Sequence, residues 1–92
     1  MKHYVITVTG KVQGVYFRDT CKAVADQLGV KGFVRNNTDG SVYIEAEGDD
    51  FALGSFLEFC HEGTDRAEVT SVDHTESVLQ HFQNFAVLRK KK

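Results

Sequence analysis

Proline and long apolar runs are missing from this sequence, and each absence excludes something. Without proline, no turn can be built on a cis-proline bond. No segment approaches the roughly 20 apolar residues that a membrane-spanning helix needs. The N-terminus also lacks the apolar run, about 7–15 residues long, of a signal peptide. We therefore expect a soluble protein of the cytoplasm, without a membrane partner.

Cysteine is also scarce, and its two copies form no metal or redox motif. Cys21 and Cys60 lie far apart in the sequence and make no CxxC pair, so zinc and thioredoxin-like chemistry have no support. Buried free thiols are the simplest interpretation. A disulfide between them stays conceivable, although a reducing cytoplasm disfavours one. The histidines show no ligand spacing, and each is expected at the surface: His3, His61, His74 and His81.

The charge balance gives no reason to expect a nucleic-acid partner, because the net charge is −2. The one basic cluster, residues 89–92, is expected to be a solvated end. The chain has 92 residues, of which 41% are apolar, and seven phenylalanines. This is enough for one two-layer core, so we expect a single domain over residues 1–92.

Hydrophobic periodicity divides the chain into strands, where apolar residues alternate, and helices, where they recur every three or four positions. The strands are predicted at 3–9, 33–36, 41–47, 67–75 and 82–88, and the helices at 17–28 and 50–62. Gly29 is expected to end the first helix, and Asp49 or Asp50 to cap the second. Residues 37–40, which end in Asp-Gly, predict a hairpin turn. Val69 and Val72 break strict alternation, which indicates a bulge or twist.

This order predicts a ferredoxin-like α+β sandwich, in which a βαββαβ chain forms an antiparallel sheet with two helices on one face and an extra C-terminal strand. In that topology the loop after the first strand can converge with Asn36 on the second. The acidic residues that follow are interpreted as an exposed strand face and a helix cap, in preference to a metal site: Glu45, Glu47, Asp49 and Asp50.

Residues 10–18, GKVQGVYFR, carry the strongest chemical signal. Two glycines before a helix can direct backbone N–H groups at one anion, and Arg18 adds a fork that matches phosphate oxygens. A tight turn with a surface arginine would explain the same residues. The stretch is neither GxxxxGK[ST] nor GxGxxG, so it is not a nucleotide-binding motif. Any anion held here is therefore expected to be small.

Two alternatives from other classes remain open. Domains that bind RNA share this topology, and Lys31-Gly32-Phe33 faintly resembles their aromatic motif, but it lies on the second strand instead of the third. A regulatory module that binds a small ligand would also suit the fold, since fold alone does not decide function.

Two longer segments resemble the signatures of the acylphosphatase family. Residues 8–18 are similar to the first signature position by position, and residues 32–36 with Gly40, Val42 and Gly48 are similar to the second. The likeness covers nearly the whole chain. It implies the ferredoxin-like fold and hydrolysis of small acyl phosphates, with no metal and no cofactor. Separately, we expect a monomer.

The resemblance also implies a role for particular residues. Arg18 matches the family's substrate-binding arginine, and Asn36 matches the asparagine that orients the attacking water. The phosphoryl group would be held by the loop amides as well, which gives a substrate-binding set of Gln13, Gly14, Val15, Tyr16, Phe17 and Arg18. Tyr16 departs from the family, which often has glycine or another small residue there, and its role stays open. A catalytically silent module that binds phosphate is the alternative.

Overall fold

The computed structural model describes residues 1–88, so the expected solvated tail at 89–92 lies outside the described residues. The chain forms seven elements in the order strand, helix, strand, strand, helix, strand, strand. They are β1 (Lys2–Lys11), α1 (Phe17–Leu28), β2 (Lys31–Asn36), β3 (Val42–Gly48), α2 (Asp50–Glu62), β4 (Glu68–Ser77) and β5 (Phe85–Val87).

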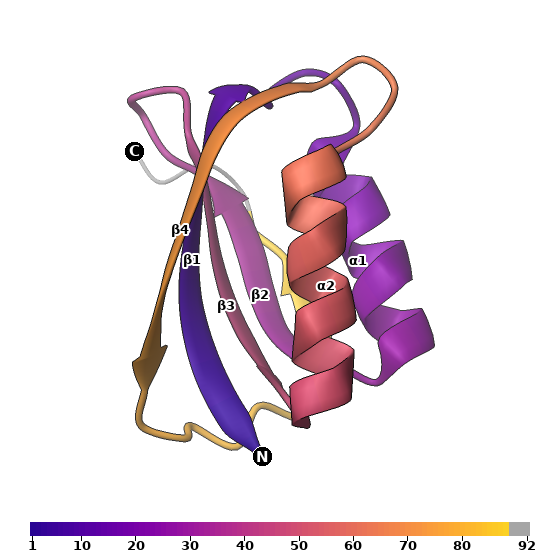
Figure 1. The fold of residues 1–92 in the computed structure, drawn as a ribbon, viewed down its shortest axis with the longest axis vertical. Helices are drawn as coiled ribbons and strands as arrows, with labels where there is room; N and C mark the ends of the chain where they lie inside the picture. The colour runs from indigo at the N-terminus through magenta and orange to yellow at the C-terminus, as the bar shows by residue number, and fades with distance from the viewer. Residues whose placement is uncertain (89–92) are drawn as a thin grey trace.

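The five strands form one sheet in the order β4-β1-β3-β2-β5, and both helices cover the same face of it (Figure 1). β1 pairs antiparallel with β3 and β4, and β3 pairs antiparallel with β2. This confirms the predicted ferredoxin-like sandwich with an extra strand. The last strand, β5, pairs in parallel with β2, which the sequence did not predict. Neither helix within residues 1–88 is long and apolar enough to cross a membrane.

Both helices begin and end where the sequence predicted, because their end signals are local. Gly29 adopts a left-handed conformation with φ 76° after α1. Its N–H donates to the carbonyl oxygens of Ala25 and Asp26 near the end of that helix. At the start of α2 the Asp49 carboxylate accepts a hydrogen bond from the Ala52 N–H. Each helix packs its apolar face against the sheet. The buried residues are Phe17, Cys21 and Ala25 in α1, and Ala52, Leu53, Phe56 and Cys60 in α2.

The irregularity predicted around Val69 is present as a bulge. β1 and β4 shift register between Thr9, which faces Ser71, and Gly10, which faces Val69. Thr70 therefore has no partner in β1. A bulge increases the local twist of a strand, and this one lies where β1 ends and the glycine loop begins.

The outward face of the sheet differs from the prediction at two residues. His3 and Glu47 are only 1% and 2% exposed, although both were expected at the surface. The segment between β4 and β5 covers them. The Glu47 carboxylate accepts hydrogen bonds from three backbone N–H groups of that segment: those of Gln80, His81 at 3.2 Å and Phe82 at 3.0 Å.

His3 joins the same cluster from β1. Its Nδ1 donates to the Val78 carbonyl oxygen at 2.8 Å. Nε2 lies 2.9 Å from Glu45 Oε1 without forming an aligned hydrogen bond. The other three histidines are exposed, as expected. The cluster holds the long connection to β5 against the sheet.

Glu47 should make the stability of the protein fall at acid pH. Burial acts to raise the pKa of its carboxyl, but the backbone N–H donors and the nearby His3 ring together hold that pKa below its usual value. A carboxyl of this kind stabilises the fold fully above its unfolded pKa, about 4.3, and stops doing so as the pH falls through its folded pKa. Glu47→Gln should therefore lower the free energy of unfolding at pH 7 by about 1.5–3 kcal/mol.

The difference in the free energy of unfolding between the wild type and Glu47→Gln should shrink as the pH falls from 7 to about 3. At low pH protonation makes the Glu47 side chain of the wild type neutral as well. Urea unfolding followed by circular dichroism measures it. Glu58→Gln, at an exposed position on α2, is the control and should differ little from wild type at any pH. A gap at Glu47 that stays constant with pH would contradict this account.

Candidate functional site

The glycine loop of residues 12–16 ends at a helix start that no side chain caps. Gly14 and Tyr16 both have left-handed backbones, with φ values of 73° and 62°. Tyr16 is the N-cap residue of α1, and its side chain makes no capping hydrogen bond. From Gly14 onward, the first backbone N–H with an acceptor among residues 1–88 is that of Thr20, which donates to the Tyr16 carbonyl. The preceding N–H groups are free for an anion.

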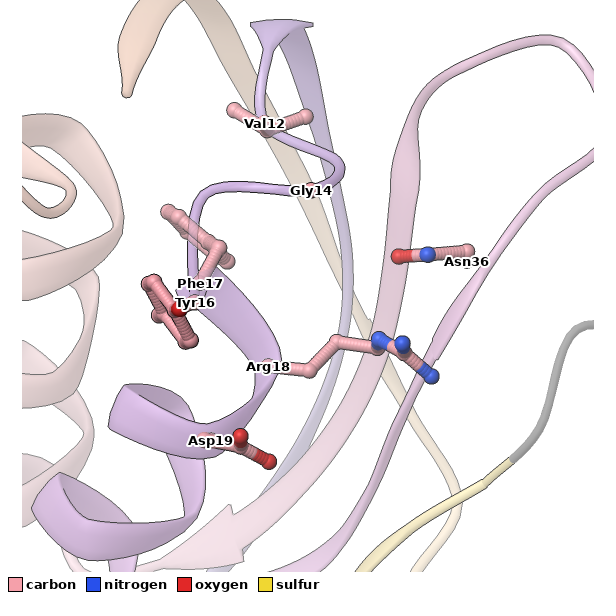
Figure 2. A pocket seen from close by; sticks show the side chains of 7 residues that line it. All are labelled: Val12, Gly14, Tyr16, Phe17, Arg18, Asp19 and Asn36. Carbon is pink, nitrogen blue, oxygen red and sulfur yellow. The ribbon is translucent and has the colours of Figure 1, made fainter. Parts of the chain in front are cut away.

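Arg18 extends from the first turn of α1 toward the strand that carries Asn36, as Figure 2 shows. Its Nη1 donates to the Leu88 carbonyl oxygen at 3.1 Å. Leu88 is itself fixed, because its N–H donates to the Val34 carbonyl at 2.8 Å. No carboxylate in the described part of the chain forms an ion pair with Arg18. The positive charge is therefore held in place by a carbonyl, and no carboxylate among residues 1–88 neutralises it.

Asn36 lies at the end of β2 and is 9% exposed. The strand register places it in one row with Val42 on β3 and Val8 on β1. Side chains in such a row point to the same face of the sheet, and here that is the face that α1 covers. The Asn36 Oδ1 atom is buried and has no hydrogen-bond partner within residues 1–88. A buried acceptor without a partner is costly and needs an explanation, such as a bound water or a catalytic role.

These groups meet in one pocket of about 320 Å³. Of the predicted site residues, the pocket is lined by Gly14, Tyr16, Phe17, Arg18 and Asn36. Gln13 and Val15 do not line it. Val15 is 5% exposed and packs into the core, and the Gln13 side chain is directed to the hairpin after β2. Only the backbone of these two residues could then reach a ligand.

Three contributions to the pocket were not predicted from the sequence. Val12 and Asp19 line it, and the Leu88 carbonyl oxygen accepts the hydrogen bond from Arg18. The sequence position of Asp19 could have indicated its place in the pocket. Asp19 follows Arg18 in the first turn of α1, and side chains of that turn surround the start of the helix. For Leu88 no local signal exists, because the contact joins residues 70 positions apart.

The cysteines lie in the core and not in the pocket. Both thiols are free and buried. Burial raises the pKa of Cys60 to about 12, and burial together with the nearby Cys60 raises the pKa of Cys21 well above its usual value. A thiol with a raised pKa is a poor nucleophile at neutral pH, so the structure agrees with a packing role.

Comparison with known proteins decides the family. The model of the acylphosphatase family matches residues 4–87. The chain belongs to the acylphosphatase family. It is therefore a hydrolase of acyl phosphates, as the resemblance of the two signatures implied. The acylphosphatase of Ligilactobacillus salivarius is 46% identical over 88 residues, which are 95% of this chain and 98% of that protein.

Other acylphosphatases are similar over the same extent. That of Thermotoga maritima is 46% identical over 87 residues, which are 95% of this chain and 97% of the relative. Among solved structures, the crystal structure of acylphosphatase from Bacillus subtilis superposes with a TM-score of 0.93 at 40% identity, and the match covers 96% of this chain and 99% of that one.

The left-handed backbone at Tyr16 suits the glycine that the resemblance to the family led us to expect here, more than it suits a tyrosine. A residue with a side chain loses about 1–2 kcal/mol in the left-handed region, whereas glycine does not. The Tyr16 ring is 69% exposed, so little burial offsets that cost. The ring lines the pocket instead of packing in the core.

Tyr16→Gly should raise the free energy of unfolding by about 0.5–1 kcal/mol, because relief of the left-handed backbone exceeds the extra chain entropy of glycine in the unfolded state. Ala23→Gly is a matched control, since it places glycine at an exposed site inside the same helix. That control should lower the free energy of unfolding by up to about 1 kcal/mol. Urea denaturation compares the two, and a loss of stability in both would refute strain at Tyr16.

Proposed function

We propose that this acylphosphatase hydrolyses small acyl phosphates at the pocket between the glycine loop and Asn36, without a metal ion or cofactor. The observation that carries the proposal is the meeting of three unmet polar features at one place. Within residues 1–88 these are the N–H groups before Thr20, which have no acceptor, the charge of Arg18, which has no carboxylate partner, and Oδ1 of Asn36, which has no donor. An anion and a water molecule would together satisfy all three.

The loop and Arg18 bind the phosphoryl group in this proposal. The N–H groups at the start of α1 have no acceptor within residues 1–88, and the positive end of the helix dipole favours a negative charge there. Arg18 contributes two or more charge-assisted hydrogen bonds to the phosphoryl oxygens. Because the Leu88 carbonyl holds the guanidinium in advance, little reorganisation accompanies binding. Charge that develops on the phosphoryl oxygens in the transition state is then stabilised by the same groups.

Asn36 orients the nucleophile. Its Oδ1 accepts a hydrogen bond from water and aims the water oxygen at phosphorus, but an amide cannot remove a proton near neutral pH. The water oxygen forms a bond to phosphorus, the bond from phosphorus to the bridging oxygen breaks, and the acyl group leaves as a carboxylate. A phosphoryl oxygen takes the proton, so the products are a carboxylate and inorganic phosphate. Positioning and charge stabilisation suffice because the carboxylate is a good leaving group.

A silent module that binds phosphate is the competing function, and it would use the same loop and Arg18. The partnerless Asn36 Oδ1 favours catalysis, because an acceptor can hold water but is repelled by an anion. The other expectations from the sequence stay predictions: a single domain over residues 1–92, a monomer, location in the cytoplasm and no nucleic-acid partner.

The purified protein should hydrolyse acetyl phosphate and benzoyl phosphate in the presence of EDTA. Arg18→Ala should lower kcat/KM by about 10³-fold or more and weaken inhibition by inorganic phosphate, since the main cation of the site is lost. Asn36→Ala should lower kcat by about 10²-fold with little change in phosphate inhibition, since it affects only the water.

Two neighbouring residues supply the controls for these variants. Arg35 stacks on Tyr43 on the outward face of the sheet, 4.3 Å from the ring centroid, so Arg35→Ala should keep its activity. Asn37→Ala removes an amide whose one hydrogen bond within residues 1–88 goes to the Ser41 hydroxyl, and it should also keep its activity. Turnover that needs added metal, or an unchanged kcat in Asn36→Ala, would overturn the proposed mechanism; binding of phosphate without turnover would favour the silent module.

A further inference from the structure

The side chain of Gln13 makes the direct link between the glycine loop and the hairpin that follows Asn36. Its Nε2 donates to the carbonyl oxygens of Asn37 at 2.8 Å and Ser41 at 2.9 Å. These contacts join positions 24 and 28 residues apart and use both hydrogens of the amide. In residues 1–88 no other hydrogen bond connects the 12–16 loop to the 37–41 turn.

We propose that Gln13 is a positioning residue for hydrolysis, which fixes the loop that holds the phosphoryl group at a set distance from the amide of Asn36. The inference rests on the proposed function, because the distance from the loop to Asn36 matters for the rate only if Asn36 orients the attacking water. Gln13 itself touches neither reactant through its side chain, since the side chain does not line the pocket. Its action passes through the hairpin to Asn36.

The hairpin can carry this effect because its turn is rigid without Gln13. The Asn37 N–H donates to the Ser41 carbonyl at 2.8 Å, and the Gly40 N–H donates to the Asn37 carbonyl at 3.3 Å. Asp39 Oδ1 accepts from the Ser41 N–H at 2.9 Å and from the Ser41 hydroxyl at 2.6 Å. Asn36 is bonded directly to this rigid turn and therefore moves with it.

The loop, in contrast, needs an external tie. Its backbone turns twice through the left-handed region, at Gly14 and Tyr16, and its N–H groups from Gly14 onward have no acceptor within residues 1–88. On the other side, the Thr64 hydroxyl donates to the Val15 carbonyl at 2.8 Å. Thr64 holds the loop toward the end of α2, and Gln13 holds it toward Asn36. Without Gln13 the phosphoryl site would stay formed but would lose its direct hydrogen bonds to the hairpin that carries the water site.

This arrangement predicts a separation between rate and binding. Gln13→Met keeps the length of the side chain and removes both donors. Both carbonyls retain their partner within the turn, so the hairpin should persist. We expect kcat for acetyl phosphate to fall by about 30- to 100-fold, since a misplacement near 1 Å can cost about 10²-fold. The inhibition constant of inorganic phosphate, which reports on the loop and Arg18, should change by less than about threefold.

A double-mutant cycle with Asn36 tests whether Gln13 acts through that residue. In the Asn36→Ala background no amide is left to position, so Gln13→Met should lower kcat by less than about threefold. A merely structural role would give the same loss in both backgrounds. Gln27→Met, at an exposed position on α1, is the matched control and should leave kcat and phosphate inhibition unchanged.

Circular dichroism and urea unfolding establish that each variant is folded at the assay temperature. If Gln13→Met does not fold, Gln13→Leu replaces it, because this variant also removes both donors and adds no charge beside the anion site. The same loss of kcat is expected. The proposal is overturned by an unchanged kcat, by a loss of phosphate affinity that parallels kcat, or by additive effects in the cycle. A normal kcat in Asn36→Ala alone would instead refute the proposed role of Asn36.

Discussion

The site depends first on the register of three strands. Val8, Val42 and Asn36 lie opposite one another on β1, β3 and β2, so the end of β1 has a fixed place relative to Asn36. That register is set by burial, because a slip of one residue would turn the apolar side chains of a strand to the opposite face. β1 is also paired on both edges, to β3 and to β4. Packing far from the pocket therefore determines where the glycine loop begins.

In the pocket beside this sheet, several polar groups lack hydrogen-bond or ion-pair partners within residues 1–88. The start of α1 lacks a cap, Arg18 has no carboxylate partner in the described residues, and the Asn36 oxygen has none of any kind there. Each omission costs stability, and α2 shows the ordinary solution, since Asp49 caps its first turn. The contrast between the two helices indicates that the incomplete bonding of α1 serves binding. Local rules of stability are often broken where function needs free groups.

The sequence predicted what local signals determine. Gly29 and Asp49 mark helix ends, alternation marks the strands, and two family signatures point to Arg18 and Asn36. It did not predict what depends on the connection between β4 and β5, because that segment has no strong pattern. Alternation placed Glu47 on the outward face but could not show that a loop covers that face. The contacts of Arg18 with Leu88 and of Gln13 with the hairpin are equally non-local. Nothing in the sequence near a glutamine indicates which distant carbonyl its side-chain amide will bind.

The hydrogen bond between Arg18 and Leu88 also has a consequence for the order in which the protein is made. A ribosome adds Leu88 seventy residues after Arg18. During translation the loop and α1 can form early, yet the carbonyl that holds the guanidinium does not exist until β5 has been synthesised and has paired with β2. A nascent chain that stops before β5 carries the arginine without its support. The fold thus delays a fully organised site until the ribosome has passed the final strand.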